Sequence, residues 1–362
     1  LLPILVAVLV PHDCTAAKKV QKFRLEIPRV TVEELEKNAT LRTGLHAYVL
    51  SGFAQKWNAI NWTLDYLTDK IPFEWVDYYP NNMNDVGSKP YLFKFDRAVK
   101  EFQTPKEFKS GKPKYMQIRL SLRGWKRLKK DFMPKPLPDV FWDDDEWINQ
   151  CMQKESKVDK PAINNFFVTN QWKFLLIGEE GTTMFFHKDG TAASSWQVQL
   201  VGKKRWTLCP NTESRLLHTQ LDTYNPDYSR FPQFADARCG QVTVSAGELL
   251  YYPAYWWHHT LQVTTPSISY TGALVGVEAD RFDLGSDRKP HVQFYADLQE
   301  KCAKCWHKGV GARQCDDISQ KWAGAAPPPL RVVCEEYLPR CLQLWSEHAK
   351  ALHGIAQKSQ EL

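Results

Sequence analysis

The sequence predicts a mainly β fold, either a sandwich or a barrel, with helices on its flanks. Between residues 172 and 274, eight short apolar or alternating segments are separated by Gly, Pro or polar turns, a spacing typical of such folds. Aromatic residues, which favour strands, are plentiful among the 362 residues: 14 Trp, 14 Tyr and 18 Phe. The 22 Pro suit a core with many loops better than a helical bundle.

The expected strands of the core are rich in bulky side chains, and turn residues end each of them. They cover residues 172–177, 182–189, 195–200, 205–209, 241–244, 249–252, 260–264 and 267–273. We therefore expect a core domain at residues 151–285. An N-terminal segment at residues 18–150 is expected to pack on it.

The N-terminal segment carries its own start signals. Thr31 precedes a predicted helix at 32–37, and Glu34 completes a capping box with it. A second predicted helix covers 62–70, with Asn61 as its candidate N-cap. Short strands are expected within residues 45–53, 73–79 and 105–125.

Composition and charge exclude some classes of partner. Apolar residues make up 43% and charged residues 24%, as in a soluble globular protein. The net charge of +6 is too mild to indicate a nucleic-acid partner. The apolar run at residues 1–10 is shorter than the roughly 20 residues that a spanning helix needs, so no stable membrane span is expected.

Four weak signals together predict the secretory pathway, and within it the ER lumen. Residues 1–17 match the remnant of a signal peptide, with a truncated anchor or a buried strand as alternatives. Asn38-Ala39-Thr40 and Asn61-Trp62-Thr63 are N-glycosylation sequons, which predict a glycoprotein. Of the nine Cys, an even number remains if Cys14 leaves with the signal. The terminal Glu361-Leu362 resembles the end of an ER-retention signal.

A candidate metal site follows from three donors. His187 and Asp189 lie two residues apart on an expected strand, so both side chains point to one face. His258 lies further along, just after an aromatic run at the end of another expected strand. Two imidazoles and one carboxylate on one face leave three coordination positions open. Non-haem Fe(II) oxygenases use this donor set, with 2-oxoglutarate in two of the open positions and O₂ in the third.

Three motifs in succession resemble the JmjC-domain (cupin-8) family of oxygenases. They are His187-Lys188-Asp189, Gly202-Lys203-Lys204-Arg205-Trp206 and Pro253-Ala254-Tyr255-Trp256-Trp257-His258. The resemblance covers about residues 40 to 280. It implies a double-stranded β-helix (jelly-roll, cupin) core with Fe(II), 2-oxoglutarate and O₂. It also implies that His258 rather than His259 is the ligand, and that Lys204 binds the distal carboxylate of 2-oxoglutarate, since a dianion in an apolar barrel needs a fixed cation.

The sequence departs from the family pattern around the co-substrate. Many relatives have Thr three residues before the first His, where Met184 stands here and offers no such hydrogen bond. Thr183 or Tyr115 is the candidate substitute. Gln197 replaces an Asn that often follows the Trp, and Glu248 replaces the Asp of a Gly-Asp turn.

The resemblance implies an Fe(II)- and 2-oxoglutarate-dependent dioxygenase. It would hydroxylate a C–H bond, or demethylate where that carbon is an N-methyl group. A secretory location favours a protein or peptide side chain in the lumen as substrate. The alternative, which Met184 permits, is a non-catalytic JmjC-fold binding protein of the secretory pathway. A metal-dependent cupin isomerase or lyase is a third hypothesis, which would turn over without 2-oxoglutarate.

Residues 286–362 differ from the core in being helical and rich in Cys. Disulfides, a zinc site or free thiols are all consistent with a group of Cys and one His: Cys302, Cys305, His307, Cys315, Cys334 and Cys341. Cys209, at a strand end, is predicted to be a buried thiol. A helical period at Leu338, Leu342 and Trp345 indicates a C-terminal helix, which either supports a homodimer or packs on its own barrel.

Overall fold

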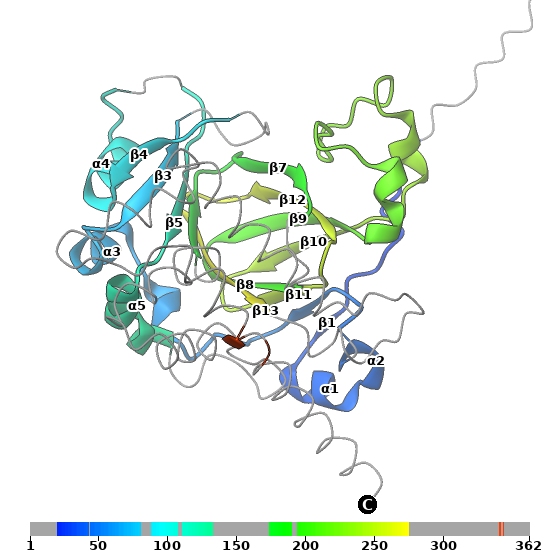
Figure 1. Ribbon diagram of the computed structural model, residues 1–362, viewed down its shortest axis with the longest axis horizontal. Coiled ribbons are helices and arrows are strands. Elements are labelled where there is room, and N and C mark those ends of the chain that lie inside the picture. Colours follow the sequence, from blue (N-terminus) through cyan, green and yellow to red (C-terminus); the bar gives the residue numbers. More distant parts are fainter. Residues whose placement is uncertain are drawn as a thin grey trace, which may run out of the picture.

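The computed structural model describes residues 20–42, 44–80, 88–107, 111–132, 174–189 and 194–274, with Arg340, Cys341 and Gln343. Figure 1 shows two β-sheets with a few short helices around them. The prediction of a mainly β, cupin-like fold is confirmed at this level.

The larger sheet has nine strands in the order β1-β2-β11-β8-β13-β6-β5-β3-β4. Its N-terminal strands are Arg29–Val30 (β1), Tyr48–Leu50 (β2), Trp75–Tyr79 (β3), Tyr91–Lys94 (β4) and Tyr115–Arg119 (β5). Its later strands are Phe174–Gly178 (β6), Ser194–Val201 (β8), Leu249–Tyr252 (β11) and Ser267–Leu274 (β13). The N-terminal segment therefore extends this sheet at both edges.

The smaller sheet has four strands in the order β10-β9-β12-β7, all paired antiparallel. They are Thr183–His187 (β7), Lys203–Cys209 (β9), Gly240–Ser245 (β10) and Trp257–Gln262 (β12). Trp206 of β9 packs against Leu250 and Tyr252 of the larger sheet. Side chains at Trp206, and at residues an even number away on β9, therefore face the larger sheet. We call this the inner face.

The main hydrophobic core lies on the other side of the larger sheet. There the ring of Tyr270 on β13 packs against Trp125 and Phe132, with ring centroids 5.7 and 4.7 Å apart. Helices α3 (Leu64–Lys70), α4 (Phe95–Gln103) and α5 (Leu122–Leu128) add apolar side chains to this cluster. They lie together beside β3 to β5 in Figure 1. This core holds the larger sheet in place, and that sheet forms one of the two walls around the interior.

Helix starts follow local capping rules, with one correction. Helix α1 (Val32–Lys37) begins after Thr31, and the predicted capping box with Glu34 is confirmed. The predicted cap Asn61 of the second helix is wrong. That residue ends a 3₁₀ turn, and α3 begins after Thr63, whose hydroxyl accepts from the Tyr66 amide. The hydroxyl of Thr63 lies directly before the first helical residue, so it caps the helix in place of the Asn61 side chain.

The strand predicted at 260–264 begins three residues earlier, at Trp257. His258 therefore lies inside β12 and not after the preceding strand. The strand β11 ends at Tyr252, and a tight turn with Tyr255 at φ +60° leads the chain into β12. A positive φ at a bulky residue is rare, so the aromatic run conceals this turn from sequence patterns.

The prediction of a buried thiol at Cys209 is wrong, because Cys209 forms a disulfide with Cys239. The two residues end β9 and precede β10, and the pairing of Leu208 with Gly240 brings their Cα atoms to 4.3 Å. The chain between them forms a lobe beside residues 20–28 in Figure 1, and its apolar side chains pack in one cluster with Phe186 of β7 and Trp257 of β12.

Several predictions fall outside the described residues. They concern the signal peptide at 1–17, the zinc or disulfide group from Cys302 to Cys334, and the helix with Leu338, Leu342 and Trp345. Cys341 is described, and it is buried and disulfide-bonded. Among the described residues, none of the helices has the length and apolarity needed to cross a bilayer.

Candidate metal centre

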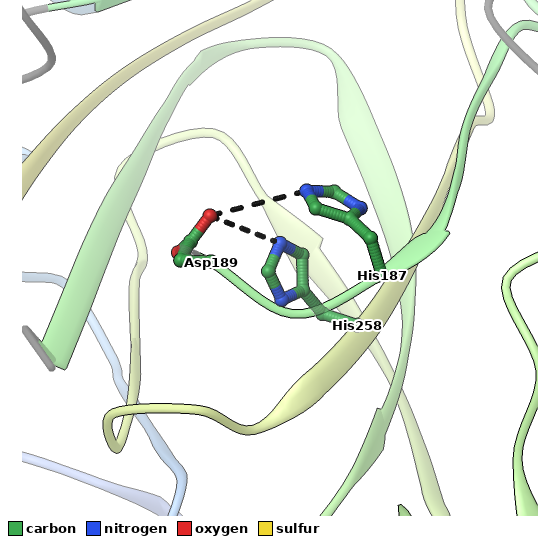
Figure 2. Close-up of side chains that lie close together, drawn as sticks. All are labelled: His187, Asp189 and His258. Atoms are coloured by element: carbon green, nitrogen blue, oxygen red, sulfur yellow. Dashed lines mark ion pairs between the residues drawn. The ribbon is translucent and has the colours of Figure 1, made fainter. Parts of the chain in front are cut away.

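Three side chains from two neighbouring strands converge on the inner face. His187 ends β7, Asp189 follows it, and His258 on β12 is the direct cross-strand partner of His187. Figure 2 shows the three side chains pointing toward one another. Oδ1 of Asp189 lies 3.9 Å from Nε2 of each imidazole. Donors that share one ion at about 2.1 Å lie roughly 3–4 Å apart, so the set fits a single metal ion.

Backbone carbonyls fix the tautomer of both imidazoles. Nδ1 of His187 lies 2.7 Å from the oxygen of Phe185, and Nδ1 of His258 lies 3.1 Å from that of Trp256. A carbonyl oxygen only accepts, so each Nδ1 donates and each Nε2 directs a lone pair toward Asp189. Desolvation, followed by the neighbouring His258, lowers the pKa of His187 to about 4. Its imidazole is therefore neutral near pH 7, as a metal ligand must be.

The carboxylate is oriented and accessible. Ser195 donates to Oδ2 of Asp189 at 3.0 Å, which leaves Oδ1 for the imidazoles. The exposed fraction of the side chain is 5% for His258, 14% for His187 and 37% for Asp189. Solvent and small molecules therefore reach the centre from the side of the carboxylate.

A register shift in β7 decides which side chains face the centre. His187 pairs with His258, but Met184 pairs with Thr260, so one extra residue lies between these pairs. Met184 is thereby placed on the inner face, with its sulfur 3.6 Å from the Gln117 amide nitrogen. Thr183 pairs with Leu261 and points to the opposite face.

Lys204 is a fully buried cation on the same face. Its Nζ donates to Oε1 of Gln197 at 2.7 Å and to Oγ of Ser269 at 2.6 Å. Among the described residues, no carboxylate pairs with it. Desolvation lowers the pKa of this ammonium from its usual 10.5 to about 7. A buried cation with neutral partners is poorly compensated, and a ligand carboxylate would supply the missing charge.

The structure brings some of the predicted residues together and separates others. His187, Asp189 and His258 form one cluster, and Gln197 contacts Lys204. Tyr115 is buried at the junction of β5 and β6, where it neighbours Tyr79. Thr183 lies away from the cluster, as described above. His259 is buried on the outer face of β12, where its Nδ1 contacts Thr223.

Sequence reasoning missed four polar residues of the inner face. Ser195 and Ser269 lie on β8 and β13, and only the strand register shows that they meet Asp189 and Lys204. Thr260 and Gln262 follow His258 at two-residue intervals on β12. The period of two along that strand would have found this second pair, had the strand been placed correctly.

The two facing sheets are typical of cupin-like proteins. The two imidazoles and one carboxylate on their inner side form a donor set of the kind that holds Fe(II). A family model described as a cupin-like domain matches residues 48–271, which is more than half of the chain. The chain belongs to this family.

Curated relatives cover parts of the chain. Lysine-specific demethylase JMJ21 of Arabidopsis thaliana is 27% identical over 250 residues, which are 64% of this chain and 23% of that protein. HSPB1-associated protein 1 of Bos taurus is 33% identical over 107 residues, or 26% of this chain and 22% of that protein. Arginine-specific demethylase JMJ20 of Arabidopsis thaliana is 24% identical over 162 residues, which are 41% of this chain and 34% of that protein. The chain thus spans well under half the length of each of these relatives.

Proposed function

We propose that this protein is an Fe(II)- and 2-oxoglutarate-dependent dioxygenase that oxidises a side chain of a protein. The outcome would be hydroxylation, or demethylation where the oxidised carbon is an N-methyl group. The observation that carries the proposal is the pairing of two features on one inner face: a preoriented triad of two imidazoles and a carboxylate, and a buried ammonium that has no carboxylate partner among the described residues.

The strand register supports a co-substrate that bridges the two features. Lys204 and Leu208 are partners of Gln262 and His258, so the cation lies four residues from the triad along the strand pair, or roughly 13 Å of backbone. A lysine side chain and a dicarboxylic acid laid end to end suit this separation. Lys204 and Gln197 would hold the distal carboxylate, while His187, Asp189 and His258 would hold the metal ion. Bound together, Fe(II) and 2-oxoglutarate supply the activation of O₂ for C–H oxidation.

Two observations support a protein substrate. The exposed side of the centre, at Asp189, is open to groups from outside. The names of two relatives describe demethylases specific for lysine and for arginine, both of which are protein side chains.

The test measures succinate formed from labelled 2-oxoglutarate by the purified chain with Fe(II) and O₂. Methyl-lysine, methyl-arginine and unmodified peptides serve as candidate substrates, and mass spectrometry detects a gained oxygen atom or a lost methyl group. His187→Ala should abolish turnover. Lys204→Met should do the same, whereas Lys203→Met is a matched control, because Lys203 is exposed on the other face of the same strand. Succinate no higher than in the His187→Ala variant with every peptide rejects the proposal.

A non-catalytic binding protein is the second candidate, and Met184 on the inner face is the observation that favours it. A thioether there gives a co-substrate only a weak acceptor. Metal analysis separates the candidates. An enzyme takes up close to one Fe(II) or Mn(II) per chain, and a binding protein without a metal role takes up almost none.

We also propose that the protein works in the secretory pathway. The Cys209–Cys239 disulfide supports an oxidising compartment, and the sequon residues Asn38 and Asn61 are both exposed. Expression in mammalian cells with endoglycosidase treatment tests this. A mass shift that disappears in an Asn38→Gln, Asn61→Gln double variant supports it. Unglycosylated protein in the cytosol rejects it.

A further inference from the structure

Thr260 and Gln262 carry buried polar atoms that nothing in the described structure satisfies. Oγ1 of Thr260, and both Oε1 and Nε2 of Gln262, are buried without a hydrogen-bond partner. The side chains are 4% and 1% exposed. Because both ends of the Gln262 amide lack partners, the observation does not depend on which end is nitrogen. Buried polar atoms are nearly always satisfied in native proteins, so these three require an explanation.

Both side chains face the same interior as the triad and the buried ammonium. They follow His258 at positions two and four residues later, so all three share one face of β12. Gln262 is the direct partner of Lys204, and Thr260 is the direct partner of both Trp206 and Met184. Thr260 thus lies between the triad and Lys204 along the strand.

A glycine on β6 lets that strand pack closely against Gln262. A Cβ atom added at Gly178 would come within 2.8 Å of Cγ of Gln262 and 3.0 Å of Cδ2 of Tyr115. The absence of a side chain at Gly178 therefore allows β6 to lie close to both side chains. The backbone of Gln262 is itself held, because its N–H donates to Thr182 and its carbonyl accepts from Gly181.

We propose that Gln262 and Thr260 are co-substrate-binding residues. Gln262 donates from its amide to the distal carboxylate that Lys204 pairs with, and Thr260 donates from its hydroxyl to an oxygen of the ligand nearer the triad. This inference rests on the proposed function and adds to it. It also gives a hydroxyl donor directly across the strand pair from Met184, whose thioether donates none.

The test compares ligand affinity and stability in the full chain loaded with Mn(II). Calorimetry measures the binding of 2-oxoglutarate and of 2-oxobutyrate, which lacks the distal carboxylate. For Gln262→Met the affinity for 2-oxoglutarate should fall about tenfold, as expected for one hydrogen bond to a charged group. Its affinity for 2-oxobutyrate should not change. Thr260→Val should weaken both ligands alike, and Gln241→Met, on the outer face of β10, should change neither.

Stability distinguishes a binding role from a structural one. Without ligand, Gln262→Met should melt at the same temperature as the wild type or higher, because an unsatisfied amide has been removed. If Gln262→Met binds 2-oxoglutarate as tightly as the wild type does, or loses equal affinity for both ligands, Gln262 does not bind the distal carboxylate. Its amide is then satisfied by water. If the wild type binds Mn(II) but neither acid, the proposed function fails as well. The two failures are therefore distinct.

Discussion

Replacing Lys204 by Met should remove a strong pH dependence of stability. The ammonium is fully buried, and desolvation lowers its pKa from 10.5 to about 7. Between those values the unfolded lysine keeps its proton and the folded one has lost it. The unfolded state therefore binds more protons, and the free energy of unfolding rises with pH in this window. Below pH 7 both states are protonated and this gain is absent.

The size of the effect follows from the shift. One proton contributes about 1.4 kcal/mol per pH unit, so the two units between pH 7 and pH 9 contribute about 3 kcal/mol. Relative to Lys204→Met, the wild type should gain that amount when the pH is raised from 6 to 9. At a denaturant slope of ~3 kcal/mol/M, the urea midpoint of the wild type moves about 1 M against the variant.

The assay is urea unfolding at pH 6 and pH 9 without metal or 2-oxoglutarate. Lys203→Met, which removes an exposed lysine one residue away, is the control and should follow the wild type. Parallel pH profiles for the wild type and Lys204→Met would refute the reasoning.

The affinity for 2-oxoglutarate should show the reverse trend with pH. Since the co-substrate needs the charged ammonium, its affinity should fall by up to about tenfold per pH unit above pH 7.

Three further predictions concern the centre and its supports. Asp189→Ala should lower Mn(II) affinity at least about tenfold by calorimetry, while the folded circular dichroism spectrum persists. Cys239→Ser should reduce stability by about 2–4 kcal/mol in urea, and Cys209→Ser should match it; equal urea midpoints for the wild type and these variants contradict this. Tyr251→Phe, which removes a hydroxyl with two buried partners, should cost about 1–2 kcal/mol, and an unchanged melting temperature excludes that role.

The strands of the core could be predicted because turn residues separate them. The pattern at 249–252 matches β11, and the one at 267–273 falls one residue short of β13. The pattern failed at β12, where bulky aromatic residues form the turn that Gly or Pro would mark elsewhere. It also missed α4, although Phe95, Val99 and Phe102 are its buried face at helical spacing. These failures concern boundaries and short elements.

The donor triad could be predicted because its first two members lie two residues apart, the first at the end of β7 and the second just after it. The rest of the inner face depends on which strands pair. Ser269 approaches Lys204 from β13, and Ser195 approaches Asp189 from β8. The same limit explains Cys209, because nothing in the sequence shows that β9 and β10 are adjacent. Pairing partners are tertiary information, and periodicity within one strand does not contain it.

The covalent bond between Cys209 and Cys239 closes the lobe at the point where it leaves the barrel. Between its ends the lobe also rests on the outer face of the smaller sheet, where Thr223 contacts His259 and the Tyr224 hydroxyl donates to the carbonyl of Arg205. Its exposed tip is the part that can be rearranged without disturbing these strands. An insertion or a grafted peptide should therefore be tolerated next to the exposed Asn225 without loss of the triad, whereas changes at the buried Leu221 and Thr223 should not be tolerated. The lobe is a site where the surface of this protein can diversify while the interior chemistry stays fixed.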